Sequence, residues 1–154
     1  MIWKSKSKRL IMYKNILFPV DVTEKSSWKI ALPVVLELTE AFKPKLHIMT
    51  VVPEYGMSIV SQFFPEKAEN TLIKGATEAL HKFTKENIPE HISKRHVITQ
   101  GTVYEAIIET ADHVNADLIV MAAHRPELKD YLLGPNAARV VRHSSRSVLV
   151  VRDD

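Results

Sequence analysis

Two short, mainly apolar runs, Leu118–Met121 and Ser147–Val151, constrain the fold of this chain most. Runs without polar alternation are typical of strands buried on both faces of a parallel sheet. Between them lie a polar loop and a short helical stretch that opens with Gly134, Pro135 and Asn136. Neighbouring parallel strands need a crossover connection of this kind, so residues 118–151 are predicted to form a strand, a helix and a second strand. The strand end and the helix start could then offer backbone N–H groups to a phosphate-sized ligand.

The rest of the chain repeats this alternation of apolar strand-like runs and helical periodicity. The predicted strands are 14–21, 45–52, 96–100, 117–121 and 147–151. The first predicted helix begins after Thr23 or Ser26, and the other three cover 66–87, 102–114 and 136–143. Strands that alternate with helices predict an α/β fold, a five-stranded, mostly parallel sheet with helices on both faces.

Three local features refine this prediction. Pro33 lies inside the first helical pattern, so that helix either kinks there or begins later. Thr102, with Glu105 three residues later, predicts a capping box. The aromatic loop 53–65 covers an edge of the core or a subunit contact, or alternatively closes over a ligand.

Composition bounds the class of protein. The chain has 154 residues, of which 45% are hydrophobic and 25% charged, and this suits one domain, which we place at 12–154. Lys and Arg exceed Asp and Glu only by 21 to 18, which gives little support to nucleic acid as a partner. There is no cysteine and no apolar stretch of the roughly 20 residues that span a bilayer, so we expect a cytoplasmic protein.

The basic segment 1–11 has no signal-peptide core, and we expect a disordered extension there. A role of its Lys and Arg residues at a membrane surface or on nucleic acid is the lesser alternative.

The strand ends predict where a ligand would bind. In open parallel sheets, ligands bind beyond the carboxyl ends of the strands, where the strand order reverses. This rule brings Asp21, Val51 and the segment 122–125 to one rim.

Several motifs together resemble the universal stress protein family, in its small bacterial branch with His-Arg-Pro in place of a glycine-rich tip. They are ILFPVD at 16–21, TVVP at 50–53, Gly101, ADLIVMAAHRP at 116–126, LLGPNAARVVRH at 132–143 and SVLVV at 147–151. The resemblance spans residues 12–152. It implies a Rossmann-like or flavodoxin-like domain of the adenine nucleotide alpha hydrolase type, and a homodimer through strand 147–151.

Many members of this family bind ATP through the pattern G-x2-G-x9-G-[ST]. Ala122, Arg125, Gly134 and Pro135 stand at its four signature positions, with one residue fewer in between, so that three of the four differ. Pro135 lacks both an N–H group and a hydroxyl, and at roughly 1 kcal/mol per lost hydrogen bond the affinity for phosphate could fall about tenfold. Arg125 could compensate for the lost donors, because its charged guanidinium group can donate paired hydrogen bonds to a phosphate. Alternatively, Pro135 simply starts the helix.

The resemblance assigns ten residues to a site for ATP or AMP, with Mg2+ or Mn2+ held mainly by phosphate oxygens. They are Pro19, Val20, Asp21, Val51, Ala122, His124, Arg125, Gly134, Pro135 and Asn136. Asp21 would contact the ribose or adenine side, although it could also cap the first helix. The backbone of Val51 would read the adenine edge, and His124, Gly134 and Asn136 would line the phosphate end.

No motif predicts catalysis. The histidines have no metal-binding spacing, and the chain lacks GxxxxGK[ST], GxSxG and GxGxxG. The family resemblance, together with the rim of strand ends, implies a nucleotide-binding regulatory module that acts through a protein partner. The alternatives are an interaction protein of the same fold without nucleotide, a regulator of a transporter, and an enzyme that hydrolyses ATP slowly.

Overall fold

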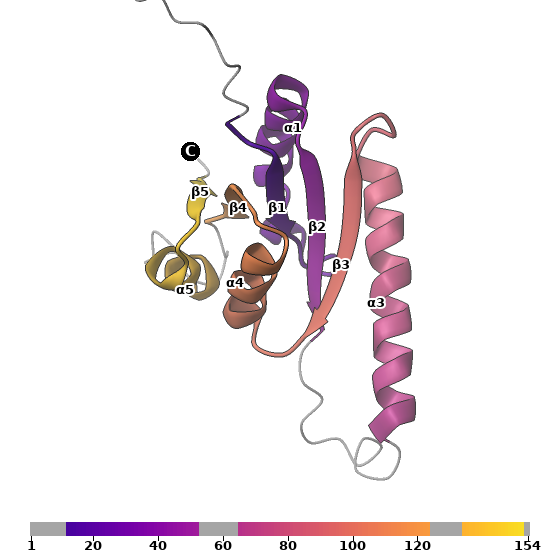
Figure 1. The fold of residues 1–154 in the computed structure, drawn as a ribbon. Helices are drawn as coiled ribbons and strands as arrows, with labels where there is room; N and C mark the ends of the chain where they lie inside the picture. Colours follow the sequence, from indigo (N-terminus) through magenta and orange to yellow (C-terminus); the bar gives the residue numbers. More distant parts are fainter. Residues whose placement is uncertain (1–11, 53–64, 124–133, 153–154) are drawn as a thin grey trace, which may run out of the picture.

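The computed structural model describes residues 12–52, 65–123 and 134–152. Strands and helices alternate along these segments (Figure 1). The elements are β1 (Asn15–Pro19), η1 (Lys25–Ser27, a 3-10 helix), α1 (Ala31–Phe42), β2 (Lys45–Val52), α3 (Pro65–Asn87), β3 (Lys94–Gln100), α4 (Val103–His113), β4 (Leu118–Ala122), α5 (Pro135–His143) and β5 (Ser147–Val151).

The five strands form one parallel sheet in the order β3-β2-β1-β4-β5, which confirms the predicted fold class. The chain first builds outward from β1 through β2 to β3 and then returns to the other side of β1 with β4 and β5. The strand order therefore reverses between β1 and β4, the position where open α/β sheets bind ligands.

Two hydrophobic clusters hold the helices on the two faces of the sheet. Ile16 and Phe18 of β1 pack in the cluster that α1 and α3 complete, and Leu17 packs in the one that α4 and α5 complete. All three side chains are fully buried, as expected for a central strand of a parallel sheet. Figure 1 shows α4 and α5 on one side of the sheet and α1 on the other.

The start of α1 decides between the two alternatives that Pro33 left open. The helix begins at Ala31, later than its apolar pattern suggests. Pro33 is therefore the third helical residue, where a missing N–H breaks no intrahelical bond. Trp28, which precedes the helix, packs edge-on against Phe83 of α3 at 4.9 Å between ring centroids.

The predicted capping box is wrong in its side-chain bonds. Thr102 is the N-cap of α4 in extended conformation, but its side chain makes no capping hydrogen bond. The Glu105 carboxylate instead accepts a hydrogen bond of 3.0 Å from the Tyr104 hydroxyl. This neighbour competes for the carboxylate that the motif would direct back to the Thr102 N–H.

None of the helices in the described segments is both long and apolar enough to cross a membrane. The aromatic residues of the predicted loop 53–65, Tyr55, Phe63 and Phe64, and the extension 1–11 lie outside the described residues.

Candidate functional site

A cavity of about 510 Å³ opens at the carboxyl ends of β1, β2 and β4. The segment after β1 and the first turns of α4 and α5 complete its wall together with α3. The cavity lies at the point where the strand order reverses, as the strand-end rule predicts. Its volume is within the range of roughly 300–1,000 Å³ that is typical of small-molecule sites.

Most of the residues predicted from the sequence meet at this cavity. Seven of the ten line it: Pro19, Val20, Asp21, Val51, Ala122, Gly134 and Asn136. Pro135 begins α5 beside them but is exposed and does not line the cavity. His124 and Arg125 lie outside the described residues.

Asp21 stands at the rim, and its carboxylate is held in a tight turn. Its Oδ1 accepts hydrogen bonds from the Thr23 N–H at 3.0 Å and the Thr23 hydroxyl at 2.7 Å. The Ser27 hydroxyl donates to the Asp21 carbonyl at 3.0 Å and accepts from the Asp21 N–H at 3.0 Å. Asp21 therefore organises the segment after β1 and does not cap α1, and among the described residues its Oδ2 has no hydrogen-bond partner.

Val51 lies in β2 beyond the point where β1 ends, and its backbone groups face the β1 side of the strand. The last bond between these strands runs from the Val20 N–H to the Met49 carbonyl at 2.8 Å, and the Gly101 N–H reaches the Val52 carbonyl from the β3 side at 3.1 Å. Alternate residues of a strand direct their N–H and C=O groups to the same neighbour. The N–H and C=O of Val51 therefore point where β1 would continue, next to the cavity that Val51 lines.

The junction before α5 retains few backbone donors. The Gly134 N–H donates to the Ala123 carbonyl at 3.0 Å, and Pro135 at the first helical position has no N–H. The first intrahelical bond runs from the Ala138 N–H to the Gly134 carbonyl at 3.0 Å. Within the described residues, the N–H groups of Asn136 and Ala137, both at the cavity, are therefore the donors left in the first turn.

Helix α3 forms one wall of the cavity, which the amino-acid sequence did not indicate. The wall consists of Thr71, Leu72 and three small residues that are adjacent or one helical turn apart, Gly75, Ala76 and Ala79. Small residues at this spacing on a long amphipathic helix were the available signal, but it is equally typical of close helix packing. With Met49 and Ile107, they make the floor and walls predominantly apolar.

The charged side chains that line the cavity are acidic. Asp21 and Glu24 are the charged residues among those that line the cavity, and no described Lys, Arg or His joins them. Within the described part of the chain, no three His, Cys, Asp or Glu residues lie close enough to hold a metal ion. The arrangement suits a flat apolar group with hydrogen-bonding edges, a hydroxylated group near Asp21, and an anion at the start of α5.

The family model and the similar proteins point to the same family. The model of the universal stress protein family matches residues 12–152. Universal stress protein G of Escherichia coli O157:H7 is 31% identical over 144 residues, which cover 92% of this chain and all of that protein. Universal stress protein MJ0577 of Methanocaldococcus jannaschii is 26% identical over 162 residues, which cover 92% of this chain and 96% of that protein.

Solved structures show the same fold. The structure of MJ0577 superposes with a TM-score of 0.72 at 27% identity and covers 93% of this chain and 98% of that one. A universal stress protein in complex with cAMP gives a TM-score of 0.57 at 23% identity, and covers 92% of this chain and 98% of that one.

Proposed function

The chain belongs to the universal stress protein family, and we propose that its cavity binds an adenine nucleotide and that the protein is a regulatory module rather than an enzyme. A protein partner would recognise the nucleotide-bound form.

The geometry of the cavity supports an adenine ring between the strand ends and α3. The ring is flat and apolar on its faces, and its edge carries an acceptor beside a donor. The apolar wall of Ala76 and Ala79 suits the faces, while the N–H and C=O groups of Val51 complement the edge. An apolar slot beside a backbone donor and acceptor of Val51, for which the described residues supply no partner, is the observation that carries the proposal.

The remaining parts of a nucleotide have complementary groups on either side. Oδ2 of Asp21 is placed to accept hydrogen bonds from ribose hydroxyls, because Thr23 occupies only Oδ1. The N–H groups of Asn136 and Ala137 offer an anion site at a helix start. The structure of a relative in complex with cAMP, an adenine nucleotide with one phosphate, supports the same ligand class.

Calorimetric titration with adenosine, AMP and ATP tests the proposal, with Mg2+ or Mn2+ added to ATP. We expect Asp21→Asn to weaken all three ligands by about tenfold, because losing a hydrogen bond to a charged group costs roughly 1.5–3 kcal/mol. Glu109→Gln is the matched control, since it removes the same charge from an exposed residue of α4 that does not line the cavity. Absence of heat with every ligand at millimolar concentration would refute nucleotide binding.

The number of phosphates that the site prefers follows from the junction before α5. With the Gly134 N–H already bonded and Pro135 lacking one, we propose that AMP and ATP bind with similar affinity. Pro135→Ser restores an N–H and adds a hydroxyl, so we expect ATP to bind about tenfold more tightly, at roughly 1 kcal/mol or more for each bond to a charged acceptor. Adenosine, which has no phosphate, should bind the variant and the natural protein equally.

An interaction protein without nucleotide remains the second candidate, because three signature positions of the family pattern differ. It predicts that nucleotide shifts the thermal stability of neither the natural protein nor the Asp21→Asn and Arg125→Ala variants. Slow hydrolysis of ATP is the enzymatic alternative, and it requires phosphate release above a protein-free blank that Arg125→Ala abolishes.

A further inference from the structure

The end of the molecule opposite the cavity carries exposed apolar side chains. Met12 is 62% exposed and Phe42, the last residue of α1, is 36% exposed. The Phe42 ring meets the ring of Tyr13, the residue after Met12, edge-on at 5.0 Å between centroids. Two of the four exposed large apolar side chains in the described segments therefore belong to residues at this end of the molecule.

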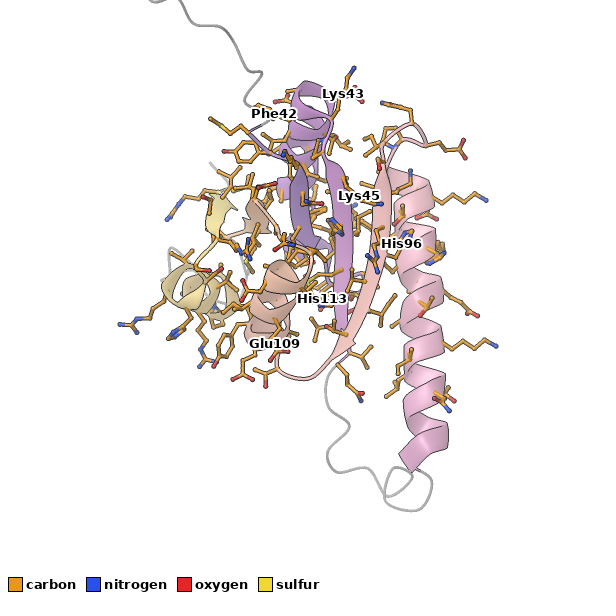
Figure 2. All side chains as sticks on the ribbon, in the orientation of Figure 1. Phe42, Lys43, Lys45, His96, Glu109 and His113 are labelled. Atoms are coloured by element: carbon orange, nitrogen blue, oxygen red, sulfur yellow. The ribbon has the colours of Figure 1, made fainter. Side chains whose placement is uncertain are left out.

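Three exposed lysines belong to the same end of the sheet. Lys14 precedes β1, and Lys45 begins β2 with its N–H bonded to the Lys14 carbonyl at 2.8 Å. Lys43 ends α1 in the left-handed conformation, with φ of 50°. Figure 2 shows Phe42, Lys43 and Lys45 at this same end of the molecule. We call Met12, Tyr13, Lys14, Phe42, Lys43 and Lys45 the amino-terminal pole.

The neighbouring carboxylates are already engaged. Oδ2 of Asp117 accepts the N–H groups of Lys14 and Asn15 at 2.7 and 2.8 Å. The Glu40 carboxylate pairs with His91. Within the described ranges no acidic side chain forms an ion pair with a lysine of the amino-terminal pole, so their charges are available to an external partner.

The distribution of charge along the sequence reinforces this surface. The first twenty residues contain five Lys or Arg and no Asp or Glu, and Asp21 is the first acidic residue. The other residues contain 16 Lys and Arg against 18 Asp and Glu, a net charge of −2. The whole positive excess thus belongs to the segment that leads into the amino-terminal pole, a segment that also includes Trp3, Leu10 and Ile11.

We propose that the amino-terminal pole docks on an anionic phospholipid surface. Lysines near such a surface gain from the negative potential of the lipid headgroups, while Met12 and Phe42 can enter the interface. One signal alone gives only weak attachment, and the pole combines both. Exposed apolar side chains add little to binding a phosphate backbone, which favours lipid over nucleic acid.

Flotation of the full-length protein with vesicles tests this proposal. We expect binding to phosphatidylcholine vesicles that contain phosphatidylserine, and much weaker binding to phosphatidylcholine alone or at high salt. Lys43→Gln with Lys45→Gln should weaken binding by at least tenfold, since each basic residue near the surface contributes roughly a fivefold factor. The control Lys74→Gln with Lys85→Gln removes the same charge from exposed positions of α3 and should have little effect.

The apolar contribution is tested separately. Met12→Gln should weaken vesicle binding several-fold while the salt dependence is unchanged, because it removes no charge. Asp21→Asn should bind vesicles like the natural protein, so that failure of nucleotide binding and of lipid binding can be distinguished. Equal binding to both vesicle types, equal losses in the pole and control variants, or tighter binding to an RNA oligonucleotide than to vesicles would overturn the proposal.

Discussion

Gly75 and Gly101 offer a comparison of two glycines that differ in backbone conformation. An added Cβ would have nothing within 4 Å at either position. Gly75 lies within α3, whereas Gly101 has φ of +122°, a conformation that L-residues rarely adopt. Any difference between alanine substitutions at these positions must therefore come from the backbone rather than from packing.

We expect Gly75→Ala to raise the free energy of unfolding by about 0.5–1 kcal/mol, because alanine is the better helix former. Gly101→Ala should lower it by roughly 1–3 kcal/mol, the cost of a strained backbone. Urea unfolding measures both. If Gly101→Ala matched the natural protein, the positive φ would not be required for the turn into α4.

His47 makes stability depend on pH. It is 3% exposed, its Nε2 lies 3.0 Å from Asn15 Oδ1, and its buried Nδ1 has no hydrogen-bond partner in the described part of the chain. Burial, and then the charges of Arg95 and Lys45, lower the pKa of His47 from its usual 6.5. Because the unfolded chain then binds protons more readily, this contribution to stability is complete above about pH 6.5 and is lost as the pH falls toward the folded pKa.

His47→Gln keeps a donor toward Asn15 but cannot titrate, so we expect a shallower loss of stability between neutral and mildly acidic pH. The exposed His113→Gln serves as control. Chemical unfolding at a series of pH values gives the slopes. His96, whose pKa is lowered by burial, His81 and Lys94, should preserve part of the dependence. Identical slopes in His47→Gln and the natural protein would contradict this role of His47.

At the scale of elements, β5 is an edge strand that pairs only with β4 in the described sheet. Leu149 is 37% exposed there and Val141 of the adjacent α5 is 47% exposed. An apolar edge strand tends to pair with another chain, and we propose a homodimer through Ser147–Val151.

Light scattering should give a particle of twice the 17.5 kDa chain mass. Leu149→Lys should shift it to the monomer, because a charge on an edge strand opposes pairing. The same charge introduced at the exposed Thr102 should leave the dimer intact. A 17.5 kDa particle for the natural protein at micromolar concentration would refute the dimer.

Apolar patterning predicted every strand, and the bounds of β2 and β5 agree with the prediction. It failed where the boundary depends on a distant partner. Lys94 and Arg95 belong to β3 because they pair with Leu46 and His47 of β2, which an apolar pattern cannot indicate. Similarly, the bonds between Asp21 and Ser27 hold the chain before α1 outside the helix.

At the scale of the whole molecule, the strand-end rule located the cavity and brought Asp21, Val51 and Ala122 to it. The wall from α3 could not be predicted in this way. Figure 1 shows α3 running alongside β3 and continuing beyond the end of the sheet, and this placement depends on its length and on its packing against β2 and β3. The sequence also could not indicate that the Gly134 N–H is already bonded, because its acceptor is the carbonyl of Ala123, just after β4.

The hydrogen bond from Gly134 to Ala123 has a consequence for how this protein can change in evolution. It joins the point where the chain leaves β4 to the point where it enters α5. With both ends fixed, the cost of closing the intervening segment rises only slowly with its length, by roughly 0.6 kcal/mol for each doubling. Insertions and deletions between these two residues can therefore alter what the rim recognises while the sheet beneath it stays unchanged.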